Sequence, residues 1–501
     1  MIKEKLSGYF ARVFSIDYRS LAIFRIALAL LILFDLSFRA RALVAHYTNS
    51  GVLFTSAIAD YYGHSSFWSF HLLSGSLWFQ IVLFIIAAVF AFFLLIGWHS
   101  RIFMFLSWLM LISLQTRNPM ILQGGDIFLR VIAFWAIFLP LGKKWAVDAL
   151  RQKNINNKKE VFSFGSAGLL LQIAIVYFFS ALLKNGSEWT PDGTAVYFAL
   201  SIDQFATHFG KWLLMQSSLL PFLTYAVYYF ELIGPFLLFV PFFFGPIRTI
   251  IAFGFVLLQF GMGIALHLGP FPWVASFAMI AFLPAWFWDK FIIGKKIENI
   301  FDNFGDKIRF SKLNIYRFRV NYPIYKENKF NKILYFIMNV VAAFFIAYIF
   351  LWNVQTLGRD AVPNKAEWVA YVTRTDQMWN MFSPYPLKED GWYVIPATLA
   401  DGSKVDLFRD GLPVSWDKPP HVAALYPHER WRKYMMNLWD KNNAGYRQYY
   451  LDYLCYEWNS EHEGQKRAVE VEMYFMEEFT LDNYEHEPVE KVLLHSSPCY
   501  N

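Results

Sequence analysis

Charged residues are scarce in this chain, at 17% of its 501 positions, and cysteine is nearly absent, with two residues in all. Hydrophobic residues instead make up 56% of the chain and aromatic residues 20%, well above the apolar share of an average soluble domain. Phenylalanine alone occurs 53 times, more than a soluble core needs but readily accommodated on a lipid-facing surface. The composition therefore predicts an integral membrane protein.

Common catalytic and metal-binding signatures are also missing. The sequence has no Walker loop, no dinucleotide-binding glycine run, no HExxH and no GxSxG elbow. Its histidines show no spacing typical of metal ligation, so we expect no metal. Cys455 and Cys499 lie in neither a CxxC nor a metal-ligand pattern. A disulfide between them and two inert thiols are both compatible with the sequence.

Nine segments are long and apolar enough to cross a bilayer, which takes roughly 17–25 residues as a helix. They lie near residues 20–38, 77–97, 102–116, 124–141, 163–183, 219–243, 247–268, 270–287 and 333–353. The third segment is short and the fourth carries charges. No small-residue cleavage site follows the first segment, so we expect a membrane helix there and not a signal peptide.

Lysine and arginine set the expected orientation, because they concentrate in cytoplasmic loops. The loops at 142–162 and 288–332 are rich in both, whereas those at 39–76 and 184–218 are poor in them. We therefore expect an inner (cytoplasmic) membrane protein with a cytoplasmic N-terminus and a C-terminal domain outside, in the periplasm. These basic loops also explain much of the positive charge, so no nucleic-acid partner is expected.

Hydrophobic periodicity divides the chain into three parts. Residues 1–19 form an amphipathic lead-in, residues 20–353 a transmembrane domain, and residues 354–501 a domain of strands and helices. The predicted elements of the last part are two strands around the turn at Asp401-Gly402, helix over 424–458 and a strand at 469–475. The expected fold is thus a multi-pass α-helical membrane protein with about nine transmembrane helices and a small mixed α/β extracytoplasmic C-terminal domain.

Ionisable residues inside membrane spans are costly and mark candidate functional sites. Tyr177, Ser180 and Lys184 are spaced by three and four, so they share one helix face. Lys184 ends its span, where an amine either snorkels to water or is held in a dry cavity. In a dry cavity its neutral form is favoured, and a neutral amine is a usable base. Further candidates are Asp126, Arg130, Glu188, Trp189, Glu231 and His267.

Several motifs together resemble one known family. They are Asp17-Tyr-Arg-Ser-Leu-Ala-Ile-Phe-Arg25, Arg117-Asn118-Pro119 followed by Gly124-Gly125-Asp126, Leu139-Pro140-Leu-Gly with Trp145-Ala-Val-Asp148, Lys184-Asn-Gly-Ser-Glu188-Trp189, His267-Leu-Gly-Pro-Phe271-Pro272-Trp273 and Gln377-Met-Trp379-Asn-Met-Phe382-Ser-Pro384. Over about residues 15–290 the chain resembles the bacterial horizontally transferred transmembrane (HTTM) domain family, which is similar to the vitamin K-dependent gamma-carboxylase.

The resemblance implies a specific chemistry. The carboxylase uses reduced vitamin K, oxygen and carbon dioxide to convert glutamate into gamma-carboxyglutamate, and a lysine begins the reaction by deprotonating the quinol. In this sequence that lysine corresponds to Lys184. A separate hypothesis, which the resemblance does not imply, makes Asp126 a second catalytic residue that orients Lys184. The implied partners are membrane lipid, a lipid-soluble quinone and an exported protein or peptide substrate. The implied cofactor is reduced vitamin K or another quinol.

Two departures leave alternatives open. The family enzyme has an Asn-His pair in the region matched to Gly124-Gly125-Asp126, and two consecutive lysines where this chain has Leu183-Lys184. The alternatives are a quinone- or lipid-handling oxidoreductase without carboxylation and a non-enzymatic, partner-binding membrane protein. Both enzyme hypotheses predict a closed apolar cavity that reaches Lys184. The non-enzymatic one predicts Lys184 at the water interface, paired with Glu188 or solvent.

Overall fold

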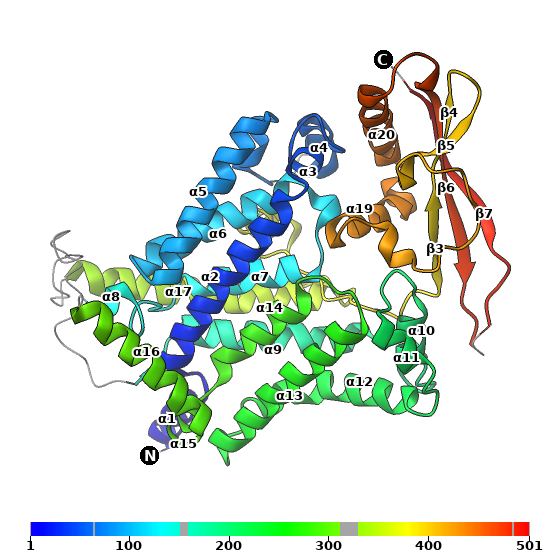
Figure 1. Ribbon diagram of the computed structural model, residues 1–501. Helices are drawn as coiled ribbons and strands as arrows, with labels where there is room; N and C mark the ends of the chain where they lie inside the picture. The colour runs from blue at the N-terminus through cyan, green and yellow to red at the C-terminus, as the bar shows by residue number, and fades with distance from the viewer. Residues whose placement is uncertain (1, 64–65, 151–158, 311–328, 483–484, 500–501) are drawn as a thin grey trace.

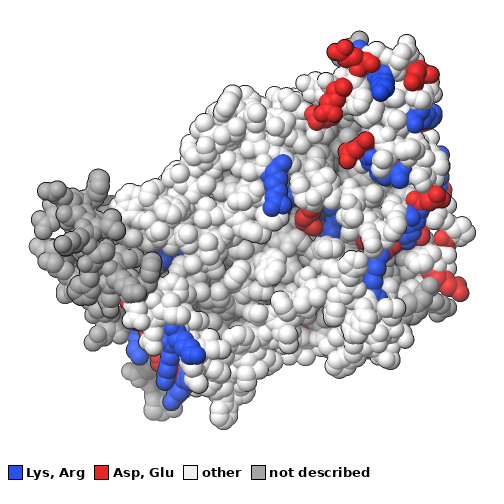
Figure 2. Space-filling model, viewed as in Figure 1, with Lys and Arg blue, Asp and Glu red and all other residues white. Residues whose placement is uncertain are grey.

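The computed structural model describes residues 2–63, 66–150, 159–310, 329–482 and 485–499, and shows a helical bundle beside a C-terminal domain that contains the main sheet (Figure 1). Charged side chains on the face in Figure 2 gather over the C-terminal domain and around helices α15 (Ala285–Lys290) and α16 (Ile292–Phe310). The surface of the bundle between these regions is largely uncharged. This distribution is what a membrane-embedded bundle with polar ends requires.

Six helices in the described part of the chain are long and apolar enough to cross a membrane. They are α2 (Tyr18–Ala40), α5 (Leu77–Ile96), α9 (Phe164–Leu183), α12 (Leu220–Leu237), α13 (Phe244–Ala265) and α17 (Lys329–Gln355). Their outward faces carry large exposed apolar residues, such as Trp78 and Leu257. Such side chains are stable facing lipid, so the protein is an integral membrane protein.

The expected count of nine spans is not confirmed, because three of the predicted segments differ from a full span. Helix α6 (Ser100–Arg117) carries an arginine near each end, and α7 (Gly124–Ala136) has only 13 residues. The segment 270–287 breaks into α14 (Phe271–Ala278), the 3₁₀ turn η3 (Met279–Phe282) and the start of α15. Almost every side chain of α7 is buried, so its apolar character reflects packing inside the bundle instead of lipid contact.

Short elements connect the long helices. At the N-terminus, α1 (Ile2–Val13) precedes a two-stranded antiparallel sheet of β1 (Ile16–Asp17) and β2 (Glu160–Val161). The loop after α2 forms the short helices α3 (Leu43–Tyr47) and α4 (Thr55–Tyr62) and the turn η1 (Phe70–Leu72). The segment between α9 and α12 forms two more short helices, α10 (Ala195–Ser201) and α11 (His208–Leu214).

The C-terminal domain is a five-stranded antiparallel sheet packed against helices. Its strands are β3 (Glu389–Val394), β4 (Pro396–Leu399), β5 (Lys404–Asp406), β6 (Ala468–Phe479) and β7 (Glu490–Pro498). The long strand β6 pairs with β3 and β4 on one side and with β7 on the other, and Gly391 lies opposite Glu477. The predicted turn at 401–402 joins β4 to β5.

Two helices lie between this sheet and the bundle (Figure 1): α19 (Glu429–Trp439) and α20 (Arg447–Glu461). They replace the single helix expected over 424–458, because the chain turns at 440–446. Strand β6 alternates as predicted, with Val471, Met473 and Phe475 buried on the helix-facing side. A disulfide joins Cys455 in α20 to Cys499 after β7, so helix and edge strand are covalently linked.

Candidate active site

Lys184 caps the C-terminal end of α9 and is buried, with 3% of its surface exposed. Its backbone N–H donates to the carbonyl of Ala181 at 3.1 Å, which closes the last turn of the helix. The side chain turns back along α9 toward Ser180, one turn earlier, as the spacing of four predicted. The amine therefore lies inside the protein and does not snorkel to water.

Three side chains surround the amine, and together with Lys184 they define what we call the lysine cluster: Ser180, Lys184, Trp189 and Glu231. Lys184 Nζ donates to Glu231 Oε2 in an ion pair and to Ser180 Oγ at 3.2 Å. It also lies 4.7 Å from the centre of the Trp189 ring, where the aromatic face attracts the positive charge. All four residues are buried. Every contact of the amine is thus with a group that stabilises its charge or can exchange its proton.

Tyr177 extends the cluster along the same face of α9. Its ring packs 4.2 Å from that of Phe255 in α13, and its hydroxyl accepts a hydrogen bond from Gln259 Nε2 at 3.4 Å. Glu231 comes from α12, so three long helices meet at this point. A carboxylate, an amide, a phenol and an amine are therefore brought together in an otherwise apolar bundle.

A segment of the C-terminal part, residues 377–388, covers the loop that follows Lys184. The carbonyl of Pro384 accepts from the N–H of Gly186 at 3.0 Å, and that of Phe382 accepts from Trp189 Nε1 at 3.0 Å. Lys388 Nζ pairs with Glu188 Oε1 at 2.9 Å. Glu188 is thus the partner of Lys388, while Lys184 pairs with Glu231. The segment holds Trp189 in position over the amine.

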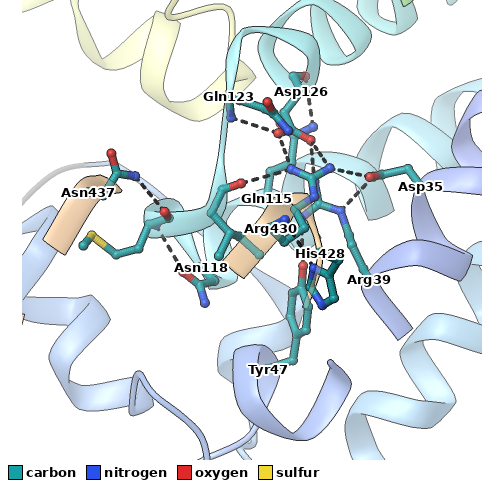
Figure 3. Close-up of polar contacts among 12 residues, drawn as sticks. Asp35, Arg39, Tyr47, Gln115, Asn118, Gln123, Asp126, His428, Arg430 and Asn437 are labelled. Carbon is teal, nitrogen blue, oxygen red and sulfur yellow. Dashed lines mark hydrogen bonds and ion pairs between the residues drawn. The ribbon is translucent and has the colours of Figure 1, made fainter. Parts of the chain in front are cut away.

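Asp126 lies in a second buried cluster, shown in Figure 3, which links α2, α7 and α19. Its Oδ1 accepts from Arg39 Nη2 at 2.5 Å and from Arg430 Nη2 at 2.8 Å. Its Oδ2 accepts from Arg430 Nη1 at 2.5 Å and from the backbone N–H of Gln123 at 2.9 Å. Asp35 completes the arrangement by pairing with both arginines. Two aspartates and two arginines therefore neutralise each other, and the group is called the Asp126 cluster below.

The edge of the Asp126 cluster contains a buried imidazole. His46 in α3 packs 4.5 Å from the ring of Trp431 and 5.9 Å from that of His428, and its ring nitrogens have no hydrogen-bond partner among the residues that the structure describes. Burial, together with the nearby His428, Arg430 and Arg39, holds the pKa of His46 well below its usual range. His46 is therefore neutral and adds no charge to the balanced cluster.

A family model for the HTTM domain matches residues 14–286, more than half of the chain. The chain belongs to the HTTM domain family. This family is associated with membrane proteins that are like the vitamin K-dependent carboxylase. No curated protein and no solved structure matches the chain.

The matched HTTM region includes both clusters, apart from Arg430 and the covering segment 377–388. The structure separates two residues that we expected to meet. Asp126 contacts Arg39 and Arg430, whereas Lys184 contacts Ser180, Trp189 and Glu231. The expectation that Asp126 orients Lys184 is therefore wrong, because both of its carboxylate oxygens already bind arginines.

Two further candidates of the HTTM region lie outside the lysine cluster. Arg130 donates to the carbonyl of Arg374 at 2.9 Å and pairs with Asp376 Oδ2 at 2.8 Å, so it fastens α7 to the C-terminal part instead of pairing with Asp126. The side chain of His267 is exposed, and its backbone carbonyl accepts from Arg432. Both residues therefore have structural contacts and no contact with the amine of Lys184.

Three basic residues that pair with sequence candidates were not themselves predicted. Arg39 and Arg430 neutralise Asp126, and Lys388 pairs with Glu188. One of these residues had a signal in the sequence: Arg39 follows Asp35 by four residues, and residues at that spacing can pair on a helix. Two cavities found among the described residues are lined by residues outside the lysine cluster. The predicted cavity that reaches Lys184 therefore stays a prediction.

The lysine cluster can move a proton within a water-poor site. An ammonium and a carboxylate removed from water are both costly, and a proton passed from one to the other leaves two neutral groups. Lys184 and Glu231 are in direct contact, so this transfer needs no intervening water. Ser180 and Trp189 also contact the amine and fix its position. The arrangement suits general base catalysis on a weakly acidic hydroxyl.

Proposed function

We propose that this HTTM protein is a membrane-embedded enzyme similar to vitamin K-dependent gamma-glutamyl carboxylase, in which Lys184 deprotonates a quinol. The observation that carries the proposal is the burial of Lys184 in direct contact with Glu231. A lysine that only anchors a helix end reaches water. A lysine that acts as a base needs a dry site and a group that takes up its proton.

Glu231 supplies that group. Transfer of one proton from Lys184 Nζ to Glu231 Oε2 leaves a neutral amine, whose lone pair can accept the hydroxyl proton of a bound quinol. Ser180 Oγ accepts a hydrogen bond from Nζ at 3.2 Å and so restricts rotation of the amine. The ring of Trp189 stabilises the ammonium that forms when the quinol proton arrives.

Aromatic side chains beside the amine fit a flat, lipid-soluble ring. Trp189 lies over Nζ, and the ring of Tyr228 is 6.5 Å from that of Trp189 in a stacked orientation. Reduced vitamin K or another quinol would supply reducing power for oxygen, and the family reaction couples this to the addition of carbon dioxide to glutamate. In that reaction quinol, oxygen, carbon dioxide and glutamate give quinone epoxide, gamma-carboxyglutamate and water.

We also propose that the protein has a cytoplasmic N-terminus and a C-terminal domain outside the membrane. The basic loops at 142–162 and 288–332 favour the cytoplasmic side of the inner membrane, with α6, α7 and the α14 segment completing nine crossings. Lys184 and the covering segment 377–388 then face outside, where an exported protein or peptide reaches them. The Lys184 contacts do not support the non-enzymatic alternative, which requires an amine at the water interface.

A second candidate, a quinol-oxidising enzyme without carboxylation, is favoured by one observation. Asp126 stands in the region where the carboxylase has an Asn-His pair. Both of its carboxylate oxygens accept hydrogen bonds from arginines. It therefore cannot take over the role of a histidine in the oxygen or carboxylation steps. This candidate keeps the role of Lys184 and differs only in the product.

The test is turnover of reduced vitamin K by the purified protein in lipid nanodiscs, with oxygen and labelled bicarbonate. Quinone epoxide together with label in a glutamate-containing peptide supports the carboxylase. Oxidised quinone without label supports the second candidate. No oxygen-dependent consumption of any quinol tested, by protein that remains folded, contradicts both.

A further inference from the structure

A cavity of about 280 Å³ lies near the N-terminal end of the chain, away from the lysine cluster. It lies between α1, β2, α13 and α15, and its lining includes Arg12, Glu160, Phe243 and Phe244. Its volume is close to the lower end of the roughly 300–1,000 Å³ typical of small-molecule sites. The cavity therefore suits a compact polar headgroup better than a whole lipid.

Three features at this cavity attract a phosphate. The guanidinium of Arg12 lies 5.6 Å from the ring centre of Phe244, on the cavity wall. Helix α13 begins at Phe244, and among the described residues no side chain caps it, so the N–H groups of Phe244 and Gly245 can donate to an anion; Pro246 has no N–H, and that of Ile247 donates to the carbonyl of Phe243. Arg248, one turn into the helix, adds positive charge behind this wall: its guanidinium lies 5.0 Å from the ring centre of Phe244, and among the described residues its Nε and Nη2 have no hydrogen-bond partner.

A negative charge also lies in this cavity. Glu160 lines it, is exposed, and is held by a hydrogen bond from Ser15 Oγ to Oε2 at 2.7 Å. Arginines and a carboxylate in one small cavity complement a ligand that carries a phosphate and an ammonium together. An anionic headgroup without an amine would instead be repelled by Glu160.

Apolar and basic surfaces around the opening match the rest of a phospholipid. Phe242 and Phe243 are 64% and 77% exposed, and Ile292 and Ile293 are also exposed. Exposed lysines at 290, 295 and 296 belong to α15 and α16. Figure 2 shows Lys and Arg side chains gathered near these helices. Aromatic and aliphatic residues next to lysines are typical of the level where acyl chains meet headgroups.

We propose that this cavity binds the headgroup of an aminophospholipid, with its phosphate at Arg12 and the N-terminus of α13 and its primary amine at Glu160. The acyl chains then lie along Phe242 and Phe243. The site is separate from the proposed quinol chemistry and does not depend on it.

The test uses the detergent-solubilised full-length protein and short-chain phosphatidylethanolamine, phosphatidylcholine and phosphatidylglycerol, with dissociation constants measured by microscale thermophoresis. Phosphatidylethanolamine should bind most tightly, because only its headgroup donates hydrogen bonds from a primary amine to Glu160. Arg12→Gln should weaken all three lipids about tenfold, the usual size of a charge-assisted hydrogen bond. Glu160→Gln should remove the preference for ethanolamine over choline.

The matched control is Lys295→Gln, which removes an exposed charge from the neighbouring surface and leaves the cavity intact. Equal weakening by Lys295→Gln and Arg12→Gln would show general surface attraction and overturn the proposal. Tighter binding of phosphatidylglycerol than of phosphatidylethanolamine would also overturn it. Soluble phosphoethanolamine should bind more weakly than the lipid; equal binding would assign the cavity to a free metabolite instead. Thermal unfolding of each variant confirms that it is folded.

Discussion

The amine of Lys184 and the carboxylate of Glu231 form an ion pair inside the membrane bundle, with 4% and 6% of their side chains exposed. It joins the C-terminal end of α9 to α12. Burying two charges costs desolvation energy that their attraction repays only in part, so such a pair is weak evidence for stability. Its value in the proposed mechanism is that a proton can move between the two groups.

Glu231→Gln should lower quinol oxidation by about 10²-fold, the lower range of a general acid–base contribution, because an amide cannot take the proton from Lys184. Glu231→Asp keeps a carboxylate and should restore part of the rate. The measurement is the initial rate of oxygen-dependent quinol oxidation in nanodiscs. A Gln variant as fast as the parent would exclude Glu231 as the proton acceptor.

Asp126→Asn should act on stability instead of on the chemistry. It removes one of two negative charges from the Asp126 cluster and leaves Arg39 and Arg430 to share Asp35, at a cost of about 3–5 kcal/mol. Thermal unfolding in detergent should show a lower midpoint. The control is Asp60→Asn, because Asp60 is exposed and should change little. An unchanged midpoint for Asp126→Asn would contradict the structural role.

Loss of the disulfide should weaken the C-terminal domain. Cys455 and Cys499 are separated by 44 positions, and a cross-link of this length stabilises a fold by about 4 kcal/mol in the chain-entropy model. Replacing both cysteines with serine should therefore make this domain more sensitive to proteolysis. Mass spectrometry of fragments after limited digestion gives the site of cleavage. Cleavage confined to the bundle would contradict the expectation.

The buried carboxyl group of Asp390 should make the stability of the C-terminal domain depend on pH. Burial raises the pKa of this carboxyl group from 3.8 to about 6, although Gln204 and the backbone N–H of Asp203 donate to it. A raised folded-state pKa means that the folded protein favours the protonated form. The contribution of Asp390 to stability is therefore greatest below pH 4 and falls as the pH rises to about 6.

Asp390→Asn isolates this effect, because asparagine does not titrate. The stability of the variant relative to the parent should shift in its favour by up to about 3 kcal/mol between pH 4 and pH 7, at about 1.4 kcal/mol per pKa unit. Unfolding midpoints measured across this range give the difference. A constant difference would show that Asp390 does not titrate with a raised pKa.

The sequence was most informative where one physical pattern dominated. Long apolar runs predicted α2, α5, α9, α12, α13 and α17, and alternation predicted β6. It did not distinguish α7, which has 13 residues, from a full span, because a short helix buried on all sides has the same composition as a lipid-facing one. Strand β7 carries weaker alternation and was missed, since its outward face mixes apolar and polar residues.

The composition of the clusters was harder to predict than their existence. Lys184, Ser180 and Tyr177 share a face by spacing alone, so that part of the geometry follows from the sequence. The pairing of Lys184 with Glu231 depends on how α9 and α12 pack, 47 positions apart. Arg430 reaches Asp126 across 304 positions, which no local pattern indicates.

The most direct test of the account is quinol oxidation by three proteins in the same nanodiscs: the parent, Glu231→Gln, and a double variant that combines Lys184→Met with Glu231→Gln. The double variant replaces both members of the buried pair, so no unpaired charge is left to unfold the bundle. If Lys184 is the base, the parent oxidises quinol in an oxygen-dependent reaction, Glu231→Gln does so slowly, and the folded double variant does not. A double variant that oxidises quinol as fast as the parent would show that Lys184 is not the base.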